Sequence, residues 1–165
     1  MSIDIKDNFL SPETLGELHK CLYSHEFPWF WMFVVNDDEV EGDLRDNYQL
    51  QHVFYDDNLA RSKFLLHLDP LLTKIQTRGL MRVKANLNYR TTNIIKHGFH
   101  NDWDYEDSKT SIFYVNTNDG YTEFEDGTVV ESIENRLVTF PSPFKHTGTS
   151  CTDSSRRVVI NINYF

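Results

Sequence analysis

Three side chains in the second half of the sequence could hold a metal ion. His100 and Asp102 are separated by one residue, and a lone His146 follows much later. Two imidazoles and one carboxylate can bind a divalent metal on one face and leave the opposite face open for chemistry. Arg157, further along the chain, adds a planar cation that could hold a carboxylate ligand beside the metal. The pattern therefore predicts an enzyme.

A His-x-Asp triplet alone indicates little, because a second one occurs at His67 and Asp69. That triplet lies in an apolar segment of helical period, where Asp69 is better explained as the N-cap of a helix that Pro70 begins. The residues around His100 and Asp102 are polar and strand-like, and in a strand residues i and i+2 point the same way. We therefore expect His100 and Asp102 to be the metal ligands.

The last apolar segment, residues 157–165, separates two faces by alternation. Val158, Ile160, Ile162 and Tyr164 fall on one face, whereas Arg157, Val159, Asn161 and Asn163 fall on the other. Because buried polar groups must be satisfied, the second face is expected to line a polar cavity. An edge strand whose polar face meets water is the alternative. By the same strand argument His97, three residues before His100, is expected to face away from the metal site.

The elements that must position these residues change character at Gly79. Before it, helical patterns at 12–24 and 57–77 predict helices, an aromatic run at 27–35 predicts a strand, and the acidic stretch 36–46 predicts a loop. After it, alternating segments predict strands at 80–90, 110–116, 121–124, 128–132, 136–140 and 156–165. Short strands that follow helices are typical of a mainly β fold, with a jelly-roll core packed against a helical layer.

Length and composition bound the class of protein. The 165 residues suit a single domain, with a helical part over about 1–79 and the jelly-roll core over about 80–165. The net charge of −9 opposes attraction to a phosphate backbone, so nucleic acid is not an expected partner. The oligomeric state is left open by the sequence.

The two cysteines and the apolar segments indicate the cellular compartment of the protein. Cys21 and Cys151 lie far apart without CxxC spacing, so they are expected to be free thiols in a reducing compartment. The first residues lack the pattern of a secretory signal. The most apolar stretch, 27–35, is about half the roughly 20 residues that a membrane span needs. We therefore expect a cytoplasmic protein without a membrane partner.

From about Leu80 to Phe165 the sequence resembles the iron(II)- and 2-oxoglutarate-dependent dioxygenases, in their prolyl-hydroxylase-like branch. His100, Asp102 and His146 match the metal-binding triad of that family in order and spacing. Arg157, shortly before the Tyr-Phe pair at 164–165, matches the basic residue that binds the far carboxylate of 2-oxoglutarate.

The cosubstrate pocket of the family is also matched. Tyr114 resembles the strand tyrosine that hydrogen-bonds the same carboxylate, and Tyr89 resembles another tyrosine of that pocket. Asn161 lies on the same face of the last strand as Arg157, and it is also expected to bind the cosubstrate. The segment 120–124 resembles the Gly-Gly-x-Thr-x-Phe stretch of the family, with Tyr121 in place of the second glycine. In the nucleic-acid demethylases of the superfamily arginines line the last strand, where this chain has asparagines.

The resemblance implies Fe(II) as cofactor, 2-oxoglutarate and dioxygen as cosubstrates, and hydroxylation of a C–H bond as the reaction. The first expectation for the substrate is a prolyl residue in a peptide or protein, and the next is a free amino acid or another small metabolite. Two other functions stay open: a cupin-like metalloprotein that does not use 2-oxoglutarate, and a jelly-roll binding module. Arg157 and Tyr114 distinguish them, because neither alternative needs a carboxylate clamp beside the metal.

Overall fold

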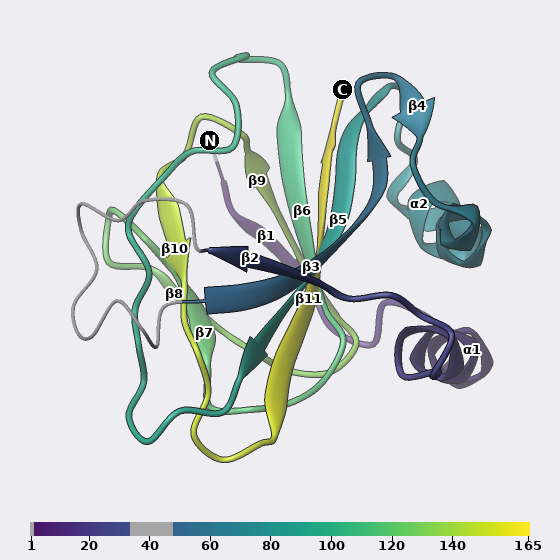
Figure 1. Ribbon diagram of the computed structural model, residues 1–165. Coiled ribbons are helices and arrows are strands. Elements are labelled where there is room, and N and C mark those ends of the chain that lie inside the picture. Colours follow the sequence, from purple (N-terminus) through teal and green to yellow (C-terminus); the bar gives the residue numbers. More distant parts are fainter. Residues whose placement is uncertain (1, 34–47) are drawn as a thin grey trace.

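The computed structural model describes residues 2–33 and 48–165, and within them the chain forms two antiparallel sheets and two α-helices (Figure 1). The larger sheet has eight strands in the order β1-β9-β6-β11-β5-β3-β2, with β4 paired to β3, and the smaller sheet has the order β10-β7-β8. The strands are β1 Asp4–Lys6, β2 Phe30–Phe33, β3 Tyr48–Asp56, β4 Leu59–Ala60, β5 Leu80–Tyr89, β6 Lys109–Tyr114, β7 Tyr121–Phe124, β8 Val129–Glu131, β9 Arg136–Pro141, β10 His146–Gly148 and β11 Arg156–Tyr164. The expected loop at 36–46 lies outside the described residues.

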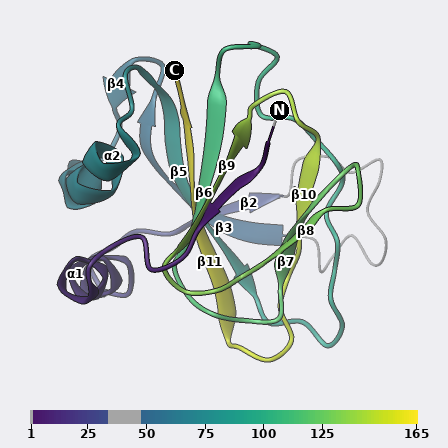
Figure 2. The ribbon, with the colours of Figure 1, turned by 180° about the vertical axis from the view of Figure 1, so that it is seen from behind.

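Both helices cover the same face of the larger sheet, and the smaller sheet lies on the opposite side (Figures 1 and 2). Helix α1, Pro12–Leu22, begins as the sequence predicts, because the Ser11 side chain accepts a hydrogen bond from the Thr14 backbone N–H. Helix α2, Asp69–Ile75, follows a 3₁₀ segment, Lys63–Leu68. The N-cap position of α2 is Leu68 and has no side-chain cap. The predicted capping role of Asp69 is therefore wrong.

The larger sheet separates two hydrophobic cores. The core on the helical side combines leucines of α1 and α2 with Val83, Ala85, Val158, Ile160 and other apolar residues of the sheet. On the other side Val159 packs with Phe124 and Val130 of the smaller sheet. The alternation predicted for the last strand is therefore confirmed, and the strand lies at the centre of the sheet instead of at its edge. The predicted mainly β jelly roll with a helical layer is confirmed as well.

The N-terminal part contributes more than helices. Strand β3 pairs with β5 near the middle of the larger sheet, and β1 and β2 also join that sheet. The predicted helix at 57–77 is correct only from Lys63 onward, since β4 precedes it. Both cysteines are buried and free, as predicted. Neither helix in the described ranges is long and apolar enough to cross a membrane.

Candidate active site

The three predicted metal ligands meet on the side of the larger sheet that faces the smaller sheet. One ligand atom from each of His100, Asp102 and His146 lies within 4.8 Å of the others. His146 begins β10, and His100 pairs with it through two backbone hydrogen bonds of 2.9 and 3.0 Å. The segment around His100 forms this single bridge instead of the predicted strand. The bridge, more than strand alternation, brings the two imidazoles together.

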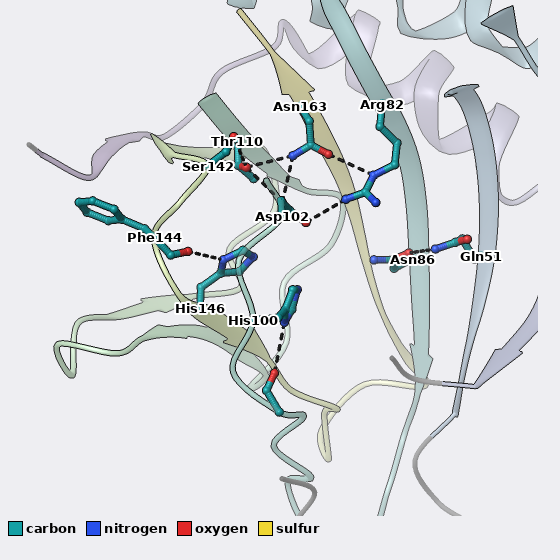
Figure 3. Close-up of polar contacts among 11 residues, drawn as sticks. Gln51, Arg82, Asn86, His100, Asp102, Thr110, Ser142, Phe144, His146 and Asn163 are labelled. Carbon is teal, nitrogen blue, oxygen red and sulfur yellow. Dashed lines mark hydrogen bonds and ion pairs between the residues drawn. The ribbon is translucent and has the colours of Figure 1, made fainter. Parts of the chain in front are cut away.

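Each imidazole is oriented by a backbone carbonyl (Figure 3). His100 Nδ1 lies 3.2 Å from the Gly98 oxygen, and His146 Nδ1 lies 3.1 Å from the Phe144 oxygen. A carbonyl only accepts, so Nδ1 must carry the proton in both rings. The Nε2 lone pairs are then available to a metal, which is the usual arrangement of histidine ligands and their outer partners.

The Asp102 carboxylate is held by three groups, as Figure 3 shows. Arg82 donates to Oδ1 at 2.9 Å, while Asn163 and Thr110 donate to Oδ2 at 3.0 and 3.1 Å. Burial alone would raise the pKa of this carboxyl. The His146 imidazole, which is protonated in the acid range where Asp102 titrates, the charge of Arg82 and the Asn163 hydrogen bond lower this pKa to about 2. Asp102 is therefore an anionic ligand at neutral pH.

His146 is buried. Burial lowers the pKa of its imidazole to about 4, although the charge of Asp102 acts in the opposite direction. The ring is therefore neutral at pH 7, which is the form that binds metal. Two imidazoles and one carboxylate whose ligand atoms lie this close together fit a divalent ion such as Fe(II) and would leave the opposite side of the ion open.

A cavity of about 240 Å³ extends from the triad along β5 and β11. Along one side of it run four cross-strand pairs in succession, defined here as the wall pairs: Arg157 with Asn88, Val159 with Asn86, Asn161 with Lys84, and Asn163 with Arg82. All of these residues except Asn163 line the cavity. The last pair holds Asp102 and marks the metal end. The first pair contains Arg157 and marks the far end. Every wall pair carries at least one polar side chain, so the cavity is built for a polar ligand.

Arg157 is 3% exposed and lines this cavity. Its Nε donates to the Ser132 hydroxyl at 2.9 Å, and its Nη2 donates to the Thr122 hydroxyl at 3.2 Å. Among residues 2–33 and 48–165 it has no carboxylate partner. A buried cation that is bound only by hydroxyls is costly. The arrangement suits a carboxylate ligand that enters the cavity.

Tyr114 lies beside Arg157 but does not line the cavity. Its hydroxyl donates to Thr122 at 2.8 Å, and the Arg157 guanidinium lies 5.7 Å from its ring centroid. Thr122 accepts from both residues and lines the cavity, so its own proton is free to be donated to a ligand. Direct contact between Tyr114 and a cosubstrate stays a prediction.

Gly120, in the segment that resembles a family motif, is needed for the position of Arg157. A Cβ at this position would lie 2.5 Å from the Ser150 oxygen and 2.6 Å from the Arg157 Cδ. Any side chain would therefore displace the arginine or the backbone. A glycine is therefore required at position 120 for steric reasons. Tyr121, which stands in place of the second glycine of the motif, is half-buried beside it.

Tyr89 and Asn161 occupy different surroundings. Tyr89 ends β5, is 43% exposed and lines a separate cavity together with Tyr48, so it is not brought together with Arg157. Asn161 lines the metal-side cavity, and its Oδ1 atom is buried without a hydrogen-bond partner among the described residues. A role for either residue in cosubstrate binding stays a prediction.

Among the cavity residues that were not predicted from the sequence, four lie on β5. Arg82, Lys84, Asn86 and Asn88 alternate on β5 with the core residues Val83, Ala85 and Leu87. The alternation that located Arg157 on the last strand is equally visible there, so it could have found them. His97 also lines the cavity and contacts Asn88. The expectation that it faces away is wrong, because residues 97–99 are not in a strand.

The chain is similar in fold to solved structures, whereas no family model and no curated protein matches its sequence. A prolyl hydroxylase from Trichoplax adhaerens, in complex with a peptide fragment of the hypoxia inducible factor oxygen degradation domain, is 15% identical. It has a TM-score of 0.67, and the match covers 99% of this chain and 83% of that one.

Two further structures extend the comparison. An oxidoreductase of the 2OG-Fe(II) oxygenase family from Burkholderia pseudomallei is 11% identical, with a TM-score of 0.65 and coverage of 98% and 84%. A non-heme alpha ketoglutarate dependent epimerase, SnoN from nogalamycin biosynthesis, is 10% identical, with a TM-score of 0.70 and coverage of 99% and 77%. The chain therefore has the fold of the 2-oxoglutarate- and iron(II)-dependent oxygenases.

Proposed function

We propose that the protein is an Fe(II)- and 2-oxoglutarate-dependent dioxygenase that hydroxylates a C–H bond. The observation that carries this proposal is the pairing, in one cavity, of a two-histidine, one-carboxylate triad with a buried arginine that lacks a carboxylate partner among residues 2–33 and 48–165. A cupin-like metalloprotein or a binding module would have no use for that arginine.

The residues fit the cofactor and the cosubstrate in chemical kind. His100, Asp102 and His146 would hold Fe(II), and Arg157 with the Thr122 hydroxyl would bind the far carboxylate of 2-oxoglutarate. With dioxygen, the bound iron and cosubstrate supply the oxidation of a C–H bond that amino-acid side chains cannot perform. The chain itself keeps the His146 imidazole neutral, holds the carboxylate ligand in place and would surround the cosubstrate with donors.

Two classes of substrate are proposed. The solved neighbour with a bound peptide supports a prolyl residue in a peptide or protein, which is also what the sequence resemblance implies. The alternative is a free amino acid or another small metabolite, and the polar wall of the cavity supports it. A cytoplasmic location accords with the free cysteines and is likewise a proposal.

The test is an anaerobic titration of the Fe(II) protein with 2-oxoglutarate, followed through the weak visible charge-transfer band of the chelate. The wild-type protein should develop the band, and Arg157→Met should need at least about tenfold more 2-oxoglutarate, because a charge-assisted hydrogen bond is lost. Lys20→Met, on the exposed face of α1, is the control for loss of a cation. Absence of the band in the wild-type protein with iron bound would refute the proposal.

A further inference from the structure

Lys84 is a cation inside the cavity that the proposed function does not use. It lies on the cavity face of β5, because its neighbours Val83 and Ala85 belong to the core on the helical side. Across the strand it pairs with Asn161, one wall pair away from Arg82 and Asn163. The ammonium group therefore reaches into the cavity near the metal end.

No acidic group of the described residues neutralises Lys84. An ion pair in this cavity joins Arg82 to Asp102, and within residues 2–33 and 48–165 no hydrogen bond or ion pair involves the Lys84 ammonium. Both oxygens of Asp102 are already engaged by Arg82, Asn163 and Thr110. Lysine is rarely buried without a partner. A ligand that supplies an anion would complete this part of the cavity.

The charge on Lys84 persists at neutral pH. Burial, followed by the repulsion of Arg82, lowers the pKa of the ammonium to about 8, while Asp102 and Asp56 oppose the shift. Most molecules are therefore protonated at pH 7. The lysine is available as a donor with a full positive charge, not as a base.

We propose that Lys84 binds a carboxylate of the primary substrate, and that this substrate is a small acid such as a free amino acid, not an internal residue of a peptide. The inference rests on the function proposed above and chooses between its two substrate classes. An internal peptide residue has no free carboxylate to place beside the metal. The cavity volume of about 240 Å³ is below the roughly 300 to 1,000 Å³ common for ligand pockets, which also favours a small substrate.

Spacing along the wall favours the substrate over the cosubstrate as the partner of Lys84. Lys84 lies two wall pairs from Arg157, which corresponds to about 13 Å between the backbone positions at about 3.3 Å per residue. A five-carbon dicarboxylate spans about 5 Å between its end carbons. The carboxylate that Arg157 would hold therefore lies too far along the wall to be the partner of Lys84 as well. Electrostatics agrees, because the charges that act on Lys84 are those of Arg82, Asp102 and Asp56, and Arg157 is not among them.

The experiment uses propionate as the probe and propionamide, a neutral molecule of the same shape, as its control. Each is titrated anaerobically into the Fe(II) protein saturated with 2-oxoglutarate, and binding is read from the charge-transfer band and from the thermal unfolding midpoint. The variants are Lys84→Met, which keeps the length of the side chain without its charge, and Lys84→Arg, which keeps the charge. Lys20→Met is the surface control.

We expect propionate to bind wild-type protein at least about tenfold more tightly than propionamide, and Lys84→Met to abolish this preference. Lys84→Arg should restore part of it, and Lys20→Met should not change it. The dissociation constant of 2-oxoglutarate should change by less than about threefold in Lys84→Met, since this cosubstrate is held at Arg157.

Three outcomes would overturn the inference. Propionate and propionamide could bind equally, or Lys84→Met could retain the preference. Lys84→Met could also weaken 2-oxoglutarate as strongly as Arg157→Met, which would assign Lys84 to the cosubstrate. Failure of the proposed function would look different: the wild-type protein would then show no 2-oxoglutarate complex at all, before any probe is added.

Discussion

Arg82 and Arg157 lie at opposite ends of the same cavity and have opposite partners. Arg82 forms a 2.9 Å ion pair with Asp102, whereas Arg157 is bound by the hydroxyls of Ser132 and Thr122. Both are on the wall pairs of β5 and β11. The charge of Arg82 is thus neutralised within the chain and serves to hold a ligand of the metal. The charge of Arg157 is left for a molecule from outside.

This difference distinguishes a buried charge that holds the protein's own residues in place from one that is available to bind a ligand. A buried charge with an internal partner orients that partner, whereas a buried charge without one raises the free energy of the empty protein. Ligand binding can then recover that free energy, so the position of an uncompensated charge indicates where an ion of opposite sign binds. Among the described residues, Arg157 is one such buried charge without an internal partner, and Lys84 is a second.

The largest effect is expected when the carboxylate ligand of the metal is itself removed. Asp102→Ala takes away one metal ligand and leaves Arg82 unpaired, so Fe(II) affinity should fall by more than about 100-fold, beyond the range for outer partners of a ligand. An anaerobic Fe(II) titration measures it. Asp69→Ala, in the other His-x-Asp triplet, is the matched control and should bind Fe(II) like the wild-type protein.

Exchanging each arginine for methionine tests the two roles directly. Arg82→Met should weaken Fe(II) binding by about 10- to 100-fold, because it frees one oxygen of Asp102, and should leave 2-oxoglutarate binding at saturating iron nearly unchanged. Arg157→Met should show the reverse pattern. Parallel titrations with iron and with 2-oxoglutarate measure both. Equal losses of both ligands in either variant would contradict the separation of roles.

A smaller effect is expected when Arg157 is displaced and not removed. Gly120→Ala puts a methyl group within 2.6 Å of the Arg157 Cδ, so 2-oxoglutarate affinity should fall by about tenfold while Fe(II) affinity is retained. Gly16→Ala is the control, because a Cβ there meets nothing within 4 Å. It should stabilise α1 by about 0.5 to 1 kcal/mol. Unaltered 2-oxoglutarate binding in Gly120→Ala would show that the arginine is not held by this contact.

The smallest effect is electrostatic and concerns His97. Burial, then the charge of Arg157, then His100 lower the pKa of His97 to about 4. The unfolded chain binds this proton near pH 6.5, so His97 stabilises the protein fully above that pH, and the stabilisation is lost as the pH falls toward 4. Arg157→Met should raise the pKa of His97, and Arg82→Met should not.

Nuclear magnetic resonance titration of the His97 ring in zinc-loaded protein measures these pKa values. Urea unfolding at pH 7 and pH 5 measures the linked stability, and the loss between the two should be smaller in Arg157→Met than in wild-type protein. A pKa of His97 that responds equally to both arginine variants would mean that the charge of Arg82 is not neutralised by Asp102.

The sequence predicted the parts of the site that lie on regular strands and missed the parts that depend on pairing between distant segments. Alternation along 157–165 assigned Arg157 to the cavity face and Val158 to the core, because a strand with one polar and one apolar face has a clear period. His97 was assigned wrongly by the same rule, since its segment is irregular. The bridge between His100 and His146 could not be inferred, because it depends on contacts between residues far apart in the chain.

Strand β3 shows the corresponding limit for the fold. Residues 48–56 pair with β5, bury His52 and Phe54, and leave their neighbours half-exposed. His52 is satisfied by the Pro28 carbonyl and the Ser62 hydroxyl, so a polar residue occupies a core position that an apolar pattern would assign to Val or Leu. Tertiary hydrogen bonds thus obscure the period of this strand in the sequence.

The position of β11 at the centre of the larger sheet bears on how the protein is made. This strand joins β5 to β6 and carries Arg157 and Asn163, yet it follows all the other strands of the described residues in sequence order. A ribosome adds residues in sequence order, so the two parts of the larger sheet cannot join, and Arg157 cannot meet Ser132 and Thr122, until residue 164 has left the exit tunnel. Until then β5 and β6 each present an unpaired edge, the condition under which strands from different chains associate. The exposure of strand edges to other chains should therefore be greatest before β11 pairs with its two neighbours.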